Sequence, residues 1–150
     1  MPTTISSVPV EINAPVEKVW SILAKIEDYP RWNPFTYRVD STLELGSQAL
    51  LYVRMSDKLK LTRDEIVTSF APNKELAWRA RGIRWLLAAN RVQRLEVIDE
   101  QHTRYTTHET FSGLLRPLVI FLMGKMVENG FNGVAHALKA YAETGAPSAG

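Results

Sequence analysis

Four polar residues in two neighbouring segments, 91–97 and 103–111, are the strongest candidates for chemistry. Alternate residues of a strand point to the same face, and the apolar residues Leu95 and Phe111 mark the face that turns inward. A guanidinium and a carboxylate on that face could orient a polar ligand, polarise a carbonyl group or move a proton. Arg91 and Glu109 are therefore the candidates for catalysis. The inward-facing polar residues, all candidates for ligand contact, are Arg91, Gln93, Thr107 and Glu109.

The polar turn 99–102 predicts that the two segments form a hairpin. The numbers of facing residues then sum to about 200 to 202, so Glu109 faces Arg91 or Gln93. An ion in a dry interior costs several kcal/mol, whereas an exposed ion pair returns roughly 0 to 1 kcal/mol. Buried groups of this kind need one another, water or a polar ligand, which favours a wet pocket. The alternative is that the strands twist until Arg91 and Glu109 form a solvated pair at the rim.

Two further carboxylates, Asp64 and Glu65, lie in the strand-like segment 61–70. They are adjacent, so on a strand they point to opposite faces and one of them must face inward. Asp64 alternates with Ile66 and Phe70, and Glu65 alternates with Leu61 and Val67, so the pattern does not show which of the two faces inward. We expect a bulged strand that turns the inward charge toward solvent.

Metal and nucleophile chemistry have no local signature. The chain has no cysteine, and His102, His108 and His136 lie at no metal-ligand spacing. Ser112 lacks the glycine pattern of a nucleophile elbow. We expect no metal and no cofactor.

Large apolar side chains are the expected walls of a ligand site. Segment 82–88 contains Trp85 where a polar hairpin loop would be ordinary, and burying such a ring is worth a few kcal/mol at about 25 cal/mol per Å². This segment can form a lid over a cavity mouth or a homodimer contact. Together with the apolar residues 118–123 it can also make a peripheral contact with a membrane surface. The expected apolar ligand contacts are Trp78, Trp85, Tyr105, Phe111 and Met126.

The elements that position these residues begin with a strand and a helix. Alternating apolar residues predict a strand over 8–12, and three- and four-residue apolar spacing predicts a helix over 16–26. Asn13 is the expected N-cap, and Pro15 fits the first helical turn. Pro30 should end helical continuation in an aromatic turn, in which Trp32 and Phe35 are assigned first to structure.

Three hairpins and a long helix follow. The turn at 71–74 is expected to be type I. Apolar spacing predicts a helix over 115–143, with Leu118 and Leu122 on its buried stripe. Small residues on one face of this helix, including Gly130, leave room for a cavity. The six strands are expected over 37–41, 49–55, 61–70, 75–81, 91–97 and 103–111.

These elements predict an α+β fold in which a curved antiparallel sheet of about seven strands wraps around the long C-terminal helix. A helix and a short helical turn lie between the first two strands. The chain has 150 residues, of which 45% are hydrophobic. This is enough for one compact domain, assigned to 1–143, with a flexible tail at 144–150.

Composition excludes several classes of protein. The net charge is +2 and the basic residues are scattered, so nucleic acid is not an expected partner. The longest apolar run, 114–124, contains Arg116 and is about half of the roughly 20 residues that cross a bilayer. We expect no transmembrane span. The start of the chain lacks a secretory signal, so the expected location is cytoplasmic.

Several motifs add a family resemblance. They are Ala14-Pro15, Val19-Trp20, Tyr29-Pro30-x-Trp32-Asn33-Pro34, Leu76-x-Trp78-Arg79 and Glu109-x-Phe111-Ser112-Gly113-Leu114-Leu115. In these motifs and in element order, residues 5–143 resemble the START-like or polyketide cyclase/dehydrase-like superfamily (SRPBCC), known for the helix-grip fold. The resemblance implies a hydrophobic ligand pocket between the curved sheet and the C-terminal helix. It implies no single chemistry, because the superfamily includes lipid carriers, hormone receptors and aromatase/cyclases.

We expect the protein to bind a small hydrophobic or aromatic molecule in a cavity between sheet and helix. Two alternatives use the same pocket. One is a polyketide-type cyclase or dehydratase, in which Glu109 or Arg91 moves a proton or polarises a carbonyl group. The other is a lipid or quinone carrier that acts at a membrane surface.

Overall fold

The computed structural model describes residues 1–147. Its strands are β1 (Thr3–Ser6), β2 (Val10–Ile12), β3 (Thr36–Ser41), β4 (Gln48–Arg54), β5 (Lys60–Ala71), β6 (Glu75–Ala80), β7 (Ala88–Asp99) and β8 (His102–Ser112). Its helices are α1 (Val16–Ala24), the 3₁₀ turn η1 (Ile26–Asp28), α2 (Tyr29–Trp32) and α3 (Arg116–Thr144). The last three residues of the expected tail, 148–150, lie outside the described residues.

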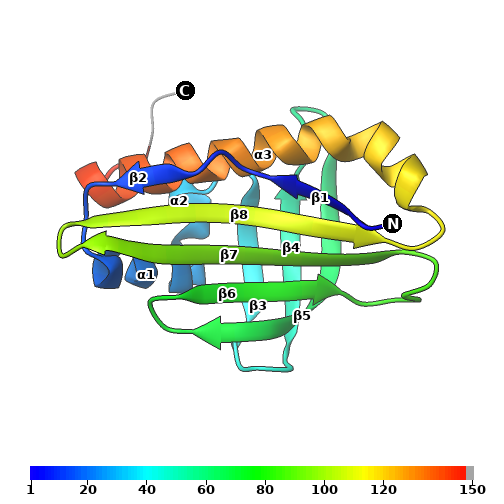
Figure 1. Cartoon of the computed structure of the whole chain (residues 1–150), viewed down its shortest axis with the longest axis horizontal. Coiled ribbons are helices and arrows are strands. Elements are labelled where there is room, and N and C mark those ends of the chain that lie inside the picture. The colour runs from blue at the N-terminus through cyan, green and yellow to red at the C-terminus, as the bar shows by residue number, and fades with distance from the viewer. Residues whose placement is uncertain (148–150) are drawn as a thin grey trace.

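One antiparallel sheet contains all the strands of residues 1–147, in the order β1-β8-β7-β6-β5-β4-β3, and β2 also pairs with β8. The sheet curves, and α3 lies along it beside β1 and β2 (Figure 1). This confirms the helix-grip fold. None of the helices in the described part of the chain has the length and apolar character needed to cross a bilayer.

The first strand differs from the prediction. Val8 lies between β1 and β2, is 49% exposed, and donates its backbone N–H to Oδ1 of Asn132 on α3 at 2.8 Å. Both short strands pair with β8, so the described sheet has one strand more than the seven expected.

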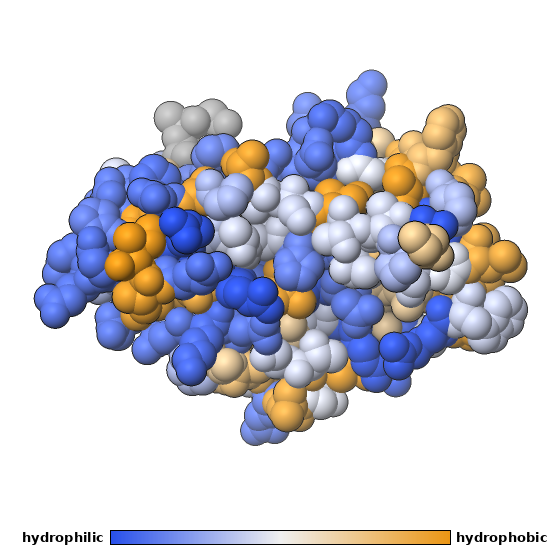
Figure 2. Space-filling model, in the orientation of Figure 1, coloured by the Kyte–Doolittle hydropathy of each residue, from blue (hydrophilic) through white to orange (hydrophobic). Residues whose placement is uncertain are grey.

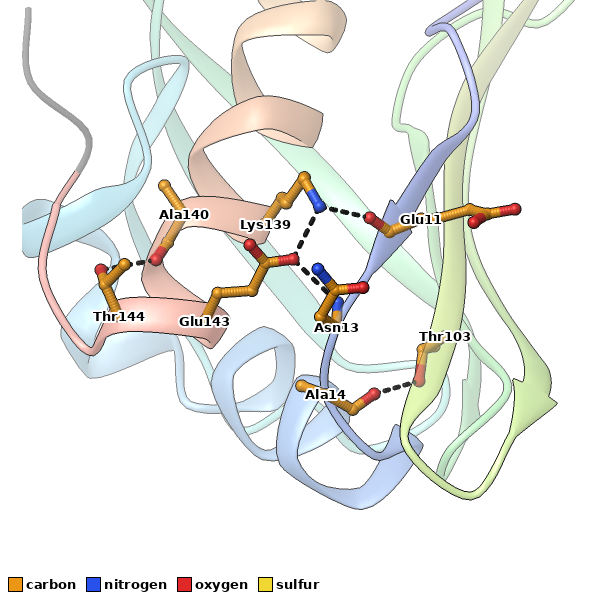
Figure 3. A network of polar contacts seen from close by, with 8 residues as sticks. All are labelled: Glu11, Asn13, Ala14, Thr103, Lys139, Ala140, Glu143 and Thr144. Atoms are coloured by element: carbon orange, nitrogen blue, oxygen red, sulfur yellow. Dashed lines mark hydrogen bonds and ion pairs between the residues drawn. The ribbon is translucent and has the colours of Figure 1, made fainter.

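The start of α1 is capped differently from the prediction. Pro15 occupies the N-cap position with no side-chain cap, so the assignment of Asn13 is wrong. The backbone N–H of Asn13 instead donates to Oε2 of Glu143 at 2.8 Å (Figure 3). Lys139 donates to the same oxygen at 2.6 Å and to the carbonyl of Glu11 at 2.7 Å. These bonds tie the last turns of α3 to β2 and to the segment that enters α1.

Two proline-containing turns also differ from the prediction. Pro30 occupies the first turn of α2, where its missing N–H needs no partner, so it begins a helix rather than ending one. In the 71–74 turn Lys74 donates to the carbonyl of Ala71 at 2.9 Å, and Asn73 has a φ of 66°. A positive φ at the third position is the geometry of a type II turn, not type I.

The C-terminal half of α3 forms the centre of the core. Its buried residues include Phe131, Val134 and Leu138, each fully enclosed. The first turns of α3, yellow in Figure 1, lie over the ends of β8 and β1, and Arg116 donates to Oγ1 of Thr3 on β1 at 2.6 Å. Val119 and Met123 face the loop of residues 82–88, whereas Leu118 and Leu122 are 53% and 55% exposed, so their assignment to the buried stripe is wrong.

Candidate ligand-binding site

A row of inward-facing side chains crosses the middle of the sheet. Val67 on β5 pairs with Trp78 on β6, Trp78 with Arg91 on β7, and Arg91 with Glu109 on β8. Directly paired residues lie side by side on one face of the sheet. Trp78, Arg91 and Glu109 are all buried, so the alternative of a solvated pair at the rim is wrong.

Arg91 is fixed by two threonines. Its Nε donates to Oγ1 of Thr107 on β8, and its Nη1 donates to Oγ1 of Thr36 on β3, both at 3.1 Å. The guanidinium carbon lies 4.7 Å from the ring centre of Phe131 and 5.8 Å from that of Phe35. Two hydrogen bonds and the two neighbouring aromatic rings hold this guanidinium in one orientation.

Glu65 is the other buried carboxylate, and the expectation that it turns toward solvent is wrong. It is 1% exposed, because the β5 bulge lies beyond it, between Val67 and Ser69. Its Oε2 lies 3.1 Å from Nη2 of Arg63, which is also 3.7 Å from Oε2 of Glu109. Burial raises the pKa of Glu65 to about 7, and the charge of Arg63 opposes that rise.

Tyr105 and Gln93 form a separate polar pair on the same face. The hydroxyl of Tyr105 donates to Oε1 of Gln93 at 2.8 Å, and both side chains are buried. Neither side chain lines the cavity or the clefts described next, so neither is placed to contact a ligand there.

The space between the sheet and α3 is nearly filled. A cavity of about 20 Å³, here called the inner cavity, is all that remains beside Trp78, Arg91 and Glu109. That is room for about one water molecule. It is lined by Phe35, Thr36, Leu51, Val53, Met55, Arg63, Glu65, Trp78, Arg91, Glu109 and Val127.

Gly130 does not leave the expected room for a ligand, because Phe35 occupies it. A Cβ atom at Gly130 would lie 2.2 Å from Cδ1 of Phe35. Phe35 is held there from its backbone: Oδ1 of the buried Asn33 accepts from the N–H of Phe35 at 3.0 Å and of Thr36 at 2.9 Å. Phe35 therefore belongs to the site, whereas Trp32 is buried and stacks on Tyr141.

Two clefts of ligand size adjoin the inner cavity. The first, here called the α3 cleft, has a volume of about 660 Å³ and shares Phe35 and Met55 with the inner cavity. It is lined by Pro34, Phe35, Arg54, Met55, Ser56, Asp57, Met126, Asn129, Gly130 and Gly133. The second, the loop cleft, has about 480 Å³ and shares Arg63 with the inner cavity. Its walls include Leu86, Leu87, Phe111, Val119 and Met123.

The structure thus divides the predicted site residues into groups. Trp78, Arg91 and Glu109 line the inner cavity, Met126 lines the α3 cleft and Phe111 lines the loop cleft. Thr107 is buried and lines none of these spaces; it accepts a hydrogen bond from Nε of Arg91, which does line the inner cavity. Trp85 is 69% exposed and lines none of these spaces, because its loop turns the ring outward.

Sequence reasoning missed Arg63, expected the charge of Glu65 to turn toward solvent, and assigned Phe35 first to structure and only second to the ligand. The signal for Glu65 was present, since it shares its alternation with the buried Val67. Arg63 has the same alternation. Phe35 carried no comparable signal, because its position depends on the bonds from Asn33. Within residues 1–147 no group of three His, Asp or Glu side chains is arranged to hold a metal ion.

Comparison with known proteins assigns the family. A family model described as "Polyketide cyclase / dehydrase and lipid transport" matches residues 3–143. The chain belongs to this family. A search of curated proteins found no match.

Solved structures share the fold at low sequence identity. An aromatase/cyclase from Streptomyces sp. R1128 has a TM-score of 0.77 and 18% identity, over 95% of this chain and 94% of that one. A START superfamily protein from Mycobacterium smegmatis has a TM-score of 0.70 and 21% identity, over 93% and 97%. Norcoclaurine synthase from Thalictrum flavum has a TM-score of 0.70 and 7% identity, over 95% and 94%. These proteins establish the fold of this family member and not its chemistry.

Proposed function

We propose that this family member binds a small hydrophobic or aromatic molecule in the α3 cleft. The observation that carries the proposal is the junction at Phe35 and Met55, where a cleft of about 660 Å³ adjoins a buried polar cavity. Ligand sites are typically concave, of about 300 to 1,000 Å³, with apolar walls and a few fixed polar groups. The cleft has apolar walls at Pro34, Phe35, Met55 and Met126 and polar groups at its other residues, and the inner cavity adds buried polar groups.

Binding of an uncharged fluorescent probe tests this proposal. We expect N-phenyl-1-naphthylamine to gain fluorescence on binding and to be displaced by small aromatic compounds. Met126→Gln should weaken binding because it places an amide in the α3 cleft. Met123→Gln is the matched control, because Met123 lies on the same helix but lines the loop cleft. Absence of binding for every compound in a broad apolar panel would contradict the proposal.

A cyclase or dehydratase is the second candidate, and Glu65 favours it. A group with a pKa of about 7 exchanges protons effectively at neutral pH, and Arg63 beside it could polarise a carbonyl group. The sequence candidates Arg91 and Glu109 line the same cavity. Turnover of a polyketide-like carbonyl substrate, lost in Glu65→Gln or Glu109→Gln while binding is retained, would support this function. Binding without turnover of any such substrate would contradict it.

A carrier that acts at a membrane is the third candidate, favoured by the exposed apolar residues where α3 begins. Figure 2 shows hydrophobic residues gathered at that end of the molecule. Segments 82–88 and 113–125 contain Arg84, Arg116 and Lys125 and no acidic residue, which suits an anionic lipid surface. The exposed apolar residues of these two segments are here called the end patch; they are Ile83, Trp85, Leu114, Leu115, Leu118, Phe121 and Leu122. The homodimer contact and the cytoplasmic location stay predictions.

A further inference from the structure

Two buried N–H groups beside the inner cavity lack an acceptor. Nη2 of Arg91 and Nε1 of Trp78 have no hydrogen-bond partner among residues 1–147. Arg91 is 4% exposed and Trp78 is 1% exposed, so solvent does not serve either group. Both residues line the inner cavity.

The positions of the two donors are fixed by the sheet. Trp78 and Arg91 are directly paired on β6 and β7, so their side chains leave the sheet side by side. Thr36 and Thr107 accept from the other two nitrogens of Arg91, which leaves Nη2 as its free donor. Neither donor needs to break another bond before it binds an acceptor.

An unpaired buried donor is costly. Leaving one without an acceptor costs about 1 to 3 kcal/mol, and native structures contain few such groups. Two of them beside one cavity indicate that an acceptor atom belongs there. The inner cavity, of about 20 Å³, has room for one oxygen atom of water or of a ligand.

We propose that the inner cavity is a subsite for a ligand oxygen of the carbonyl or carboxylate type, which accepts hydrogen bonds from Arg91 Nη2 and Trp78 Nε1. This rests on the proposed function, since the apolar body of the same ligand occupies the α3 cleft. The ligand class is therefore an aromatic or otherwise apolar molecule that carries a ketone, ester or carboxylate group. Oε2 of Glu65 also lacks a hydrogen-bond partner beside this cavity, but it is an acceptor that already lies 3.1 Å from Nη2 of Arg63.

Phe35 and Met55 separate the two parts of this site. Each lines both the inner cavity and the α3 cleft, so movement of these two side chains joins the spaces. A methionine changes rotamer at low cost, and Phe35 lies 6% exposed at the floor of the cleft. The ligand oxygen thus reaches the donors from the α3 cleft.

Three naphthalenes that differ in one group test the subsite on the full chain. 2-Acetylnaphthalene carries a neutral carbonyl, 2-naphthoate a carboxylate, and 2-ethylnaphthalene no acceptor. The first readout is the indole N–H resonance of Trp78 in the ¹⁵N-labelled wild-type protein, identified by its loss in Trp78→Phe. We expect a downfield shift with 2-acetylnaphthalene or 2-naphthoate and none with 2-ethylnaphthalene. Whichever oxygen compound shifts the resonance more identifies the favoured oxygen chemistry.

Affinity is the second readout. Trp78→Phe keeps the aromatic ring and removes the donor, and we expect it to weaken binding of the favoured oxygen compound about tenfold. Binding of 2-ethylnaphthalene should stay within about twofold of wild type. Trp32→Phe is the matched control: its Nε1 is also buried without a partner among the described residues, but Trp32 lines neither the inner cavity nor the α3 cleft.

The outcomes separate the subsite from the proposed function. Equal binding of all three compounds, with no change of the Trp78 resonance, would overturn the subsite and leave apolar binding in the α3 cleft intact. Failure of all three compounds to bind would count against both. If Trp78→Phe does not fold, the wild-type spectrum still decides the question, because Trp20→Phe, Trp32→Phe and Trp85→Phe identify the other three indole resonances and leave that of Trp78.

Discussion

Arg91 and Glu109 occupy paired positions on β7 and β8, but each takes a different partner. Arg91 donates to Thr36 and Thr107, whereas Glu109 lies 3.7 Å from Arg63 on β5. The buried charges therefore form a group that spans the sheet instead of one cross-strand pair. Within this group, burial raises the pKa of Glu65 to about 7, and one N–H of Arg91 has no acceptor.

Glu65→Gln should change how stability depends on pH. The folded state raises the pKa of Glu65 from 4.5 to about 7, so between these values the folded protein binds more protons than the unfolded chain. Its contribution therefore makes the free energy of unfolding fall as pH rises from 4.5 to 7, by about 3 kcal/mol at most. Glu65→Gln should match wild type near pH 4.5 and be more stable at pH 8.

Urea unfolding at several pH values measures this effect as a difference between variant and wild type. Asp64→Asn is the matched control, because Asp64 is adjacent, exposed and on the opposite face of β5. A Glu65→Gln protein whose stability follows the wild-type curve throughout this range would show that Glu65 is not held in the buried state described.

Gly130→Ala and Gly133→Ala should have opposite effects. Both replace glycine within α3, which by helix propensity alone is worth about 1 kcal/mol of stability. At Gly133 the new Cβ would be 3.7 Å from Cγ of Pro34, an ordinary contact, so we expect the variant to be more stable. At Gly130 it would overlap Phe35, and we expect a loss of about 1 to 3 kcal/mol before the helix gain is added.

Thermal unfolding of the two variants gives the comparison, and Gly130→Ala combined with Phe35→Leu should recover part of the loss. Equal stabilisation by both alanines would mean that Phe35 does not occupy the space over Gly130. Phe35 would then not be the side chain that limits the inner cavity.

Tyr105→Phe should destabilise the protein by about 1 to 3 kcal/mol, because Oε1 of the buried Gln93 loses its donor. Binding in the α3 cleft should be unchanged, since Tyr105 lines neither that cleft nor the inner cavity. Chemical unfolding and probe titration measure the two effects. Weakened binding at unchanged stability would instead place Tyr105 in direct contact with the ligand.

The curved sheet and its long helix could be predicted from the sequence, because alternation and helical spacing fix which faces are apolar. The length of one turn narrowed the residue facing Glu109 to Arg91 or Gln93, and the structure shows that it is Arg91. How completely side chains fill the space between sheet and helix could not be predicted in this way. It depends on Phe35, whose position is set by the two backbone hydrogen bonds that Oδ1 of Asn33 accepts and by the absence of a side chain at Gly130.

The wrong predictions for Asn13, Leu118 and Leu122 also have their cause in tertiary contacts. Asn13 has the residue type of an N-cap, but its backbone N–H donates to Glu143, 130 residues away. Leu118 and Leu122 have the spacing of a buried stripe, but at this level of α3 it is Val119 and Met123 that face the rest of the molecule. Where a helix is apolar on nearly every side, as over 118–123, spacing does not show which side is buried.

The end patch should determine any binding to membranes. Trp85→Ser with Phe121→Ser removes two side chains that are 69% and 86% exposed, so the fold should be unaffected. We expect wild type to co-sediment with vesicles containing phosphatidylserine, also at high salt, and the double variant to remain in solution. Leu45→Ser is the control, because Leu45 is 72% exposed and lies outside the end patch. Wild-type protein that binds no vesicle would remove the carrier from the candidate functions.

Methyl NMR of the four methionines tests binding in the α3 cleft most directly. Met55 and Met126 line this cleft, Met123 lines the loop cleft, and Met1 is fully exposed at the chain start. On titration with 2-acetylnaphthalene, we expect the methyl resonances of Met55 and Met126 to shift with one common affinity while that of Met1 stays fixed. Saturating ligand that leaves Met55 and Met126 unmoved, or that shifts Met123 alone, would contradict a ligand site between Phe35 and α3.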